Sequence, residues 1–277
     1  KPGYIVMPAI HLKREEVGQM FEEKGISTGK GNYDPTYLTQ CARKHLRNQF
    51  MEAGAGMTGC NFGVAKTGDI VVCTNEGNAD MSTSMPKLHL VAMGIEKIVP
   101  DYKSLAVFQR LLCRSATGQP TTAYTSHFRQ ARPGAEMHVI LVDNGRSDIL
   151  ANDEHWETLK CIRCGACMNT CPVYRRTGGY SYTYFIPGPI GINLGMLHDA
   201  SRYSDNVSAC TLCLSCDNVC PAKVNPGSQV YMWRQKLDSL HKANTMKKCM
   251  SKGMEELFDH PQLYSSALRL APLANLI

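Results

Sequence analysis

Two short runs of cysteine constrain this chain more than any other feature. The spacing C-x2-C-x2-C-x3-C-P occurs twice without a change. The runs comprise Cys161, Cys164, Cys167, Cys171 and Pro172, and then Cys210, Cys213, Cys216, Cys220 and Pro221. This is the spacing of bacterial ferredoxins, in which iron is held by deprotonated thiolates at the corners of a cluster. The sequence therefore predicts two [4Fe–4S] clusters.

The same spacing predicts that the two runs exchange a ligand. In two-cluster ferredoxins the fourth Cys of each run binds the other cluster. The predicted ligand sets are Cys161, Cys164, Cys167 and Cys220 for the first cluster, and Cys210, Cys213, Cys216 and Cys171 for the second. The Pro after each fourth Cys has no N–H to donate, so it ends the local helical turn.

Zinc, disulfides and purely structural clusters are the alternatives. Zinc sites usually combine two C-x-x-C pairs across a spacer, whereas here each run holds four Cys. The chain has 277 residues, which is too long for a disulfide miniprotein. Clusters that serve only the fold remain an alternative, but two clusters with exchanged ligands lie close together, which suits an electron relay.

Composition and charge limit the other functions. The net charge of +6 is mild, and Lys and Arg are spread along the chain, so we expect no nucleic-acid partner. No apolar run reaches the length of about 18 residues that predicts a transmembrane helix, and no signal peptide is visible. We expect a cytoplasmic protein in a reducing compartment, either free or peripheral at the inner face of the membrane.

Five further cysteines lie outside the two runs. They have apolar neighbours on helical or strand patterns, and we expect them to be buried as small hydrophobic residues. They are Cys41, Cys60, Cys73, Cys113 and Cys249.

The chain changes character near residue 150. Before it, helical and strand patterns alternate, which is typical of an α/β domain. The expected helices there cover 13–24, 35–53 and 102–113, and the expected strands 60–65, 70–73, 88–93, 121–126 and 137–142. After it we expect a helix over 154–160, a loop over 185–191 and a helix over 229–250. The predicted domains are 1–150, 151–250 and the start of a further region at 251–277, and we expect both ends to be cuts through a longer protein.

Ligand-binding residues of the first domain are harder to predict. Loops at strand ends in α/β domains often hold ligands, and the polar run 75–80 follows a predicted strand. A solvated turn explains that run equally well, as a surface ion pair explains Glu96 with Lys97. Arg129, Arg132 and Arg146 are candidates for gripping a carboxylate, and His89 fits a core histidine better than a base. The candidate ligand residues are Thr67, Glu76, Asn78, Glu96, Lys97 and Arg146.

The Gly-rich stretch 54–63 does not predict a nucleotide site. It contains neither G-x-G-x-x-G between a strand and a helix nor an ending in G-K-[ST].

These motifs together resemble the lactate-utilisation iron–sulfur protein family. The resemblance rests on the first cysteine run with its continuation to Tyr180, on the Pro-Gly-Pro-Ile-Gly segment at 187–191, and on four segments of the first domain. Those segments cover 65–68, 75–78, 94–100 and 143–147, and they resemble the family's LUD domain. The resemblance implies a LUD domain of the NagB/RpiA/CoA-transferase-like α/β fold, followed by an α-helical ferredoxin-type domain. We expect the sequence to contain only the C-terminal part of that LUD domain.

The resemblance also implies a function and partners. Family members work with a protein that carries cysteine-rich repeats and with a second LUD protein, in oxidation of L-lactate to pyruvate. We therefore expect an electron-transfer subunit that is not catalytic alone and that meets a small 2-hydroxy acid only indirectly. Three alternatives stay open. They are a relay for another 2-hydroxy acid such as glycolate or for a heterodisulfide, a redox-sensing regulatory protein, and an assembly scaffold.

Overall fold

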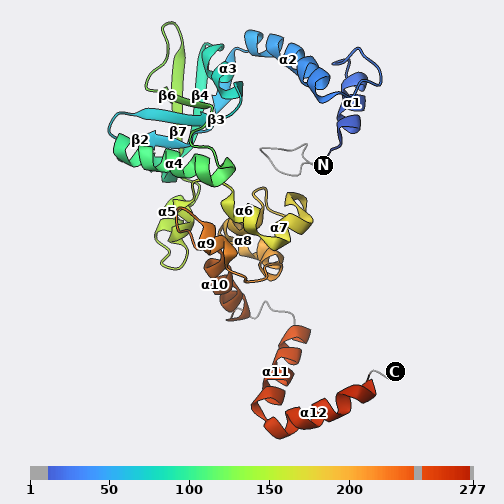
Figure 1. The fold of residues 1–277 in the computed structure, drawn as a ribbon. Coiled ribbons are helices and arrows are strands. Elements are labelled where there is room, and N and C mark those ends of the chain that lie inside the picture. Colours follow the sequence, from blue (N-terminus) through green and yellow to red (C-terminus); the bar gives the residue numbers. More distant parts are fainter. Residues whose placement is uncertain (1–11, 240–244, 275–277) are drawn as a thin grey trace. The chain divides into compact units, whose positions relative to one another are not determined.

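The computed structural model describes residues 12–239 and 245–274 (Figure 1). The chain divides into two units, Lys1–Val230 and Tyr231–Ile277. The first unit contains both the α/β region and the cysteine-rich region. The second contains the end of α10 (Pro226–Ser239) and the helices α11 (Thr245–Asp259) and α12 (Pro261–Ala274).

Two sheets organise the α/β region. One is parallel, with the strand order β1 (Ala55–Thr58), β4 (Leu88–Gly94), β7 (Glu136–Val142). The other is mixed, with the order β5 (Ile98–Val99), β2 (Phe62–Val64), β3 (Asp69–Thr74), β6 (Tyr124–Phe128). In it β2 pairs with β3 antiparallel and with β5 parallel. The expected α/β class is confirmed.

The α/β region contains helices as well as strands. The helices are α1 (Arg14–Glu23), α2 (Pro35–Glu52), α3 (Asn78–Ser84), α4 (Tyr102–Thr117) and α5 (Arg146–Leu150), with the 3-10 turns η1 (Ile95–Lys97) and η2 (Trp156–Lys160). Asp101 accepts a hydrogen bond from the backbone N–H of Ser104 at 2.9 Å and caps α4. Gly118, with φ of 75°, ends that helix in the left-handed conformation that glycine adopts without strain.

The cysteine-rich region is helical. Its elements are α6 (Ala166–Thr170), α7 (Pro172–Thr177), the 3-10 turn η3 (Gly179–Ser181), α8 (Gly188–Ser208), α9 (Ser215–Val219) and α10 (Pro226–Ser239). No described helix has both the length and the apolar character needed to cross a membrane.

One hydrophobic core joins the two regions of the first unit. Val64, Val71 and Leu105 are at most 1% exposed, and they form a cluster with Ile162. Ile162 lies between the first two cysteines of the first run, so it attaches that run to the α/β core. Burying an Ile side chain is worth about 1.5–3 kcal/mol.

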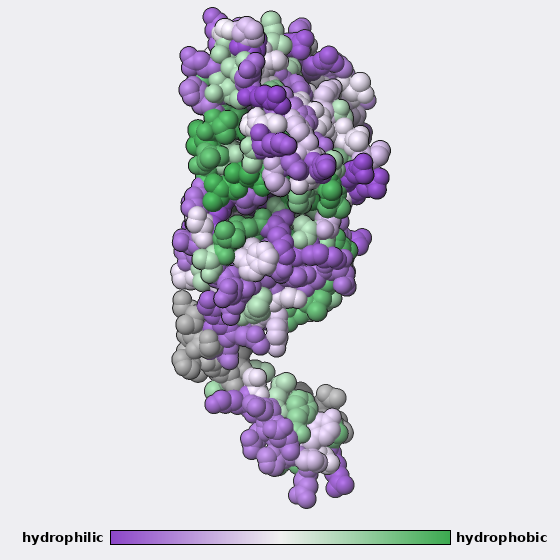
Figure 2. Space-filling model, turned by 90° about the vertical axis from the view of Figure 1, so that its left-hand side faces the viewer, coloured by the Kyte–Doolittle hydropathy of each residue, from purple (hydrophilic) through white to green (hydrophobic). Residues whose placement is uncertain are grey.

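Some hydrophobic side chains stay at the surface. Figure 2 shows such residues gathered among hydrophilic ones on one face. On the edge strand β7, Ile140 and Leu141 are 48% and 57% exposed. Parallel sheets are usually covered on both faces. At β7, side chains of this sheet are instead left uncovered by the described residues.

Several sequence expectations need correction. The expected loop 185–191 is wrong from Gly188 on, because α8 begins there and Pro189 fits the first turn of a helix. The run 75–80 is a loop only as far as Gly77, because α3 begins at Asn78. The expected helix 229–250 is two helices, since α10 ends at Ser239 and α11 begins at Thr245, and residues 240–244 lie outside the described residues.

Strand β1 was not expected, because its glycines suggested a loop. Gly56 stands in that strand because a Cβ there would lie 1.8 Å from the carbonyl oxygen of Ser82. Of the five other cysteines, Cys113 is buried and three are partly buried, but Cys249 on α11 is exposed, so the expectation of burial is wrong for Cys249.

A buried carboxylate supports the mixed sheet at the start of β3. The Asp69 side chain is 3% exposed, and Arg129 donates to it from Nε at 2.9 Å and from Nη2 at 3.2 Å. The hydroxyls of Thr67 and Tyr102 donate to the same group. These hydrogen bonds, that of Arg129 first, hold the pKa of Asp69 well below its usual range.

Asp69→Asn is expected to lower the free energy of unfolding by about 1–3 kcal/mol at pH 7, because two hydroxyls and a guanidinium lose a charged acceptor. The folded-state pKa lies below the unfolded value of about 3.9, so the carboxylate stabilises the fold above that pH and the contribution is lost as the pH falls below about 4. Urea unfolding at pH 7 and pH 3.5 measures both effects.

Arg129→Ala is the matched comparison. The substitution removes the guanidinium and leaves the carboxylate, which is 3% exposed, with only the hydroxyls of Thr67 and Tyr102 as partners, so it should also lower the free energy of unfolding and raise the pKa of Asp69 toward its usual range. A free energy of unfolding for Arg129→Ala equal to that of the wild type would contradict the role assigned to this buried ion pair.

Candidate metal centre

The two cysteine runs have the same backbone conformation. In the first run, Arg163 and Gly165 have positive φ angles of 63° and 80°. At the equivalent places of the second run, Leu212 and Leu214 have 55° and 56°. Positive φ is uncommon outside glycine and costs energy, so its repetition at three non-glycine residues indicates a constraint imposed by a site.

After these turns each run enters a short helix that carries its third cysteine. Helix α6 contains Cys167, and α9 contains Cys216. The two helices pack against each other, and the hydroxyls of Thr170 and Ser215 form a hydrogen bond between them. The two equivalent cysteine runs therefore form two equivalent short helices that pack together.

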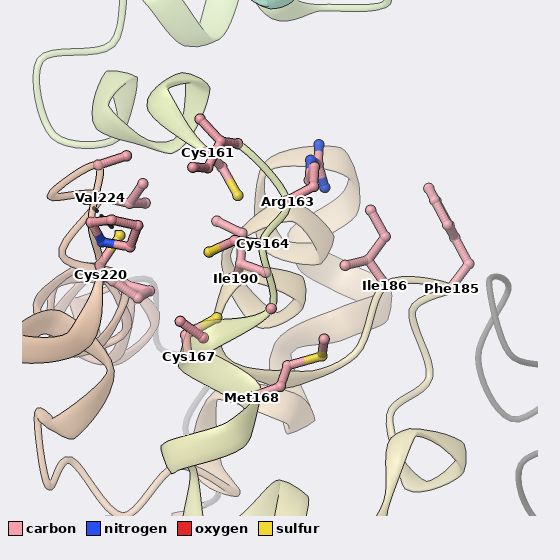
Figure 3. A pocket seen from close by; sticks show the side chains of 16 residues that line it. Cys161, Arg163, Cys164, Cys167, Met168, Phe185, Ile186, Ile190, Cys220 and Val224 are labelled. Carbon is pink, nitrogen blue, oxygen red and sulfur yellow. Dashed lines mark hydrogen bonds between the residues drawn. The ribbon is translucent and has the colours of Figure 1, made fainter. Parts of the chain in front are cut away.

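The first cavity of interest has four thiols in its wall. Its volume is about 240 Å³, and Cys161, Cys164, Cys167 and Cys220 line it together with Ile190. Figure 3 shows the sulfur atoms of these cysteines facing the same space. Three of the thiols come from the first run and the fourth from the second. This is the set that the spacing predicts for the first cluster.

Three of the other four cysteines lie near one another beside this cavity. Burial raises the pKa of Cys216, and the nearby sulfurs of Cys167 and Cys210 add to the rise. Burial also raises the pKa of Tyr182, whose hydroxyl lies close to the sulfur of Cys171 and near Cys210. Cys171, Cys210 and Cys216 are thus neighbours, while Cys213 is exposed.

The thiols of the first cavity do not ionise easily without a cation. Burial raises the pKa of Cys167 to about 12, and the sulfurs of Cys161, Cys164 and Cys220 contribute to that rise. Four thiolates in one partly buried cavity repel one another and lose hydration, so bound iron would have to supply the compensating charge. The donor set therefore fits an iron–sulfur cluster, for which soft thiolates are the usual ligands.

No three His, Cys, Asp or Glu side chains in the described ranges converge tightly enough for a single metal ion. The four thiols are instead distributed around a cavity, which is the arrangement that ligands of a multi-iron cluster require.

Buried polar groups hold the cysteine runs in place. Gln229, on α10, accepts a hydrogen bond from the hydroxyl of Thr158 at 2.7 Å and donates one to the carbonyl of Val224 at 2.7 Å. Asp217 accepts hydrogen bonds from the backbone N–H groups of Gly227 and Ser228, at 2.5 Å and 3.0 Å. The first turn of α10 therefore fixes both the entry to the first run and the helix of the second.

A lysine from the α/β region approaches the first run. The ammonium of Lys97 donates a hydrogen bond to the carbonyl oxygen of Cys161 at 3.4 Å. Burial lowers the pKa of Lys97, and the neighbouring Arg163 lowers it further. The expected Glu96–Lys97 ion pair is absent from the described contacts, because Glu96 pairs with Arg146.

The candidate ligand residues do not form one site. Glu96 and Arg146 line a common cavity, and Glu96 and Lys97 line another. Thr67 instead donates to Asp69 in a turn, and Asn78 accepts from the N–H of Ala79 at the start of α3. None of the described cavities is lined by Thr67, Glu76 or Asn78.

The remaining charged candidates have structural partners. Arg129 binds Asp69, and Arg132 donates to the carbonyls of Met85 and Pro86 at 2.8 Å and 2.7 Å. His89 is 6% exposed, shares a hydrogen bond of 2.8 Å with Thr58, and has its pKa lowered by burial. The interpretation of His89 as a core histidine agrees with these contacts.

Sequence reasoning missed Arg163, Tyr184 and His198, which line the cavity of Glu96 and Arg146. Of these residues, only Arg163 could have been noticed in the sequence, because it lies between two cysteines of the first run. Tyr184 and His198 are brought there by tertiary contacts.

Comparison with known proteins agrees with this architecture. Residues 3–149 match the LUD domain, and residues 157–224 match a 4Fe-4S dicluster domain. The fold and site define a LUD-domain protein with an iron–sulfur dicluster region, whose cysteines are compatible with two [4Fe–4S] clusters.

The chain belongs to the LUD domain family. It is 39% identical, over 99% of its length and 58% of the relative's, to "Lactate utilization protein B 1" of Bacillus mycoides. It is 44% identical to "Lactate utilization protein B" of Bacillus pumilus over 80% of this chain and 48% of the relative.

A third relative carries a different name. The chain is 42% identical to "Uncharacterized electron transport protein YkgF" of Escherichia coli, over 80% of this chain and 48% of the relative. The chain thus spans about half the length of these curated relatives, from 48% to 58%, and no solved structure matches it significantly.

Thiol reactivity offers a test of the site in its metal-free form. Alkylation requires the thiolate, so in folded, cluster-free protein at pH 8 the buried Cys167, with its pKa raised to about 12, should react more slowly than the exposed Cys213 and Cys249. Iodoacetamide labelling followed by peptide mass spectrometry gives the rates. Equal rates at Cys167 and Cys213 in folded protein would contradict the described burial.

Proposed function

We propose that this chain is an iron–sulfur electron-transfer unit of an L-lactate-oxidising system. The observation that carries the proposal is the cavity in which three thiols of the first cysteine run meet the last thiol of the second. The relatives named for lactate utilisation and for electron transport support the same role.

The proposed ligand sets follow the spacing and the cavity. Cys161, Cys164, Cys167 and Cys220 would hold the first cluster, and Cys171, Cys210, Cys213 and Cys216 the second. The electrostatic proximity of Cys167 to Cys216 supports two neighbouring centres.

The bound clusters would supply one-electron transfer, and two of them match the two electrons released when a 2-hydroxy acid becomes a 2-oxo acid. The residues of the chain contribute the surroundings. Ile162 and Ile190 exclude water from the thiols, since they are 8% and 6% exposed. The ammonium of Lys97 places a positive charge beside Cys161, which favours the more negative, reduced state at that site.

Other proteins would complete the reaction. Iron–sulfur clusters do not abstract hydride, so the substrate C–H bond would be broken elsewhere, at a flavin or on a partner. We propose a protein with cysteine-rich repeats and a second LUD protein as those partners. The chain would be one subunit of an oxidoreductase complex, meeting the hydroxy acid through them.

The exchange of ligands between the runs is testable by substitution. Cys220→Ser should destroy the cluster of Cys161, Cys164 and Cys167, and Cys171→Ser should destroy that of Cys210, Cys213 and Cys216. Each variant should retain about four iron atoms of the roughly eight expected for two [4Fe–4S] clusters. Iron and acid-labile sulfide assays, with electron paramagnetic resonance (EPR) of reduced protein, would measure this.

A double variant identifies the cluster to which Cys220 belongs. Under the exchanged assignment, the double variant of Cys220→Ser with Cys164→Ser loses no more iron than Cys220→Ser alone. Loss of all the iron in that double variant would show that Cys220 belongs with the second run.

The proposed function itself is tested by reduction in the assembled complex. Protein purified without oxygen and mixed with both partner proteins should show L-lactate-dependent cluster signals in EPR, while D-lactate serves as the control. Clusters that dithionite reduces but that L-lactate leaves oxidised in the complete complex would contradict the role in lactate oxidation.

A further inference from the structure

A second cavity, of about 370 Å³, shares a wall with the cavity of the four thiols. Cys161, Arg163, Phe185 and Ile186 line both. Its other walls come from η1 and the start of α5 in the α/β region, and from η2 and α8. Of the polar groups that line it, the proposed electron relay uses only the thiol of Cys161 as a ligand. Its volume is within the range of small-molecule sites, which often form where two domains meet.

Two charged side chains in this wall form an ion pair with each other. The Arg146 Nε donates to the carboxylate of Glu96, and the two side chains are 23% and 7% exposed. Arg146 also donates from Nη1 to the carbonyl of Asp143 at 2.7 Å. The negative charge of Glu96 is therefore balanced within the wall, and Arg146 is held in one orientation.

Arg163, unlike Arg146, forms no ion pair with a described residue. Its side chain is exposed, and no described residue forms a hydrogen bond or ion pair with its guanidinium. Figure 3 shows that this group points away from the thiols of Cys164 and Cys167. The backbone at Arg163 is left-handed, with φ of 63°.

Both arginines lie near the hydroxyl of Tyr184. Burial raises the pKa of Tyr184, and the positive charges of Arg163 and Arg146 oppose the rise. Because Glu96 balances the guanidinium of Arg146, the guanidinium of Arg163 is left as a positive charge that no carboxylate in the wall balances. This charge complements a monoanion.

Part of the remaining wall is apolar. Ile149, Leu194 and Leu197 face the same cavity. His198 lies just before a break in α8, where Asp199 leaves the helical conformation and caps the second half by accepting from the N–H groups of Ser201 and Arg202. A short hydrocarbon group with one anionic end fits such a wall.

We propose that this cavity binds a small monocarboxylate, with Arg163 receiving its carboxylate and the leucines of α8 contacting its carbon chain. The inference deepens the proposed function and rests on it in one respect, since a molecule held there would lie beside Cys161 and so next to the first cluster. Planar guanidinium groups bind carboxylates through two parallel hydrogen bonds, which gives both strength and orientation.

Calorimetric titration of the cluster-loaded chain without oxygen tests the binding. The probes are pyruvate, propionate and the neutral propionamide. Pyruvate and propionate should bind and propionamide should not, because the amide lacks the charge that Arg163 recognises. Arg163→Met should weaken pyruvate binding at least tenfold, while Arg163→Lys keeps part of the affinity. Arg176→Met, the matched loss of an exposed arginine outside the cavity, should leave it unchanged.

Leu197→Trp provides a test that leaves the cysteine run untouched, because it fills the cavity from α8. Lost pyruvate binding in this variant, at normal iron content, would support the location, and unchanged affinity would overturn it. Absence of pyruvate and propionate binding to the wild type, or equal weakening by Arg176→Met, would also overturn the proposal.

EPR of the same samples after dithionite reduction separates the two proposals. Normal cluster reduction without carboxylate binding refutes the ligand site and leaves the relay standing. Carboxylate binding to protein whose clusters cannot be reduced refutes the relay and leaves the ligand site standing.

Discussion

The arrangement of the first unit depends on four thiols that share one cavity although they come from both cysteine runs. Neither run can line this cavity alone, since Cys220 reaches it from the second. Burial and mutual repulsion raise the pKa of Cys167 to about 12. The four thiols can therefore all be ionised only when a bound cation balances their charge. The helices α6 and α9, the capped start of α10 and the left-handed turns all serve to hold these groups together.

The α/β region is part of this arrangement and does more than precede it along the chain. Ile162 packs into the core beside Val64 and Val71, and Lys97 donates to the backbone of Cys161. A change in the α/β region, such as a ligand near Arg146, would therefore reach the first cysteine run through direct contacts. This contact gives a physical basis for combining a LUD domain with an iron–sulfur region in one chain.

Much of this could be predicted from the sequence, and the errors have physical reasons. Strands β3, β4 and β7 follow hydrophobic patterns that local sequence already reveals. Strand β1 was missed because Gly56 serves close packing against α3, a contact that no local pattern shows. The start of α8 was missed because Pro and Gly indicate loops in general, although Pro189 is compatible with a first helical turn. The candidates do not form one site because Thr67 and Arg129 bind the buried Asp69, while Asn78 lies at the start of α3.

The sequence by itself determined the chemistry of the metal centre, because the spacing of cysteines within one run restricts which thiols can converge, and thiolates restrict which metals they suit. It also determined the α/β class through hydrophobic periodicity. Only the tertiary structure decided which residues surround the thiols. Arg163, Tyr184 and His198 are separated along the chain, and they meet Glu96 and Arg146 because the α/β region and the helical region share a core. Such proximity arises from packing between distant segments, for which a single sequence carries no local signal.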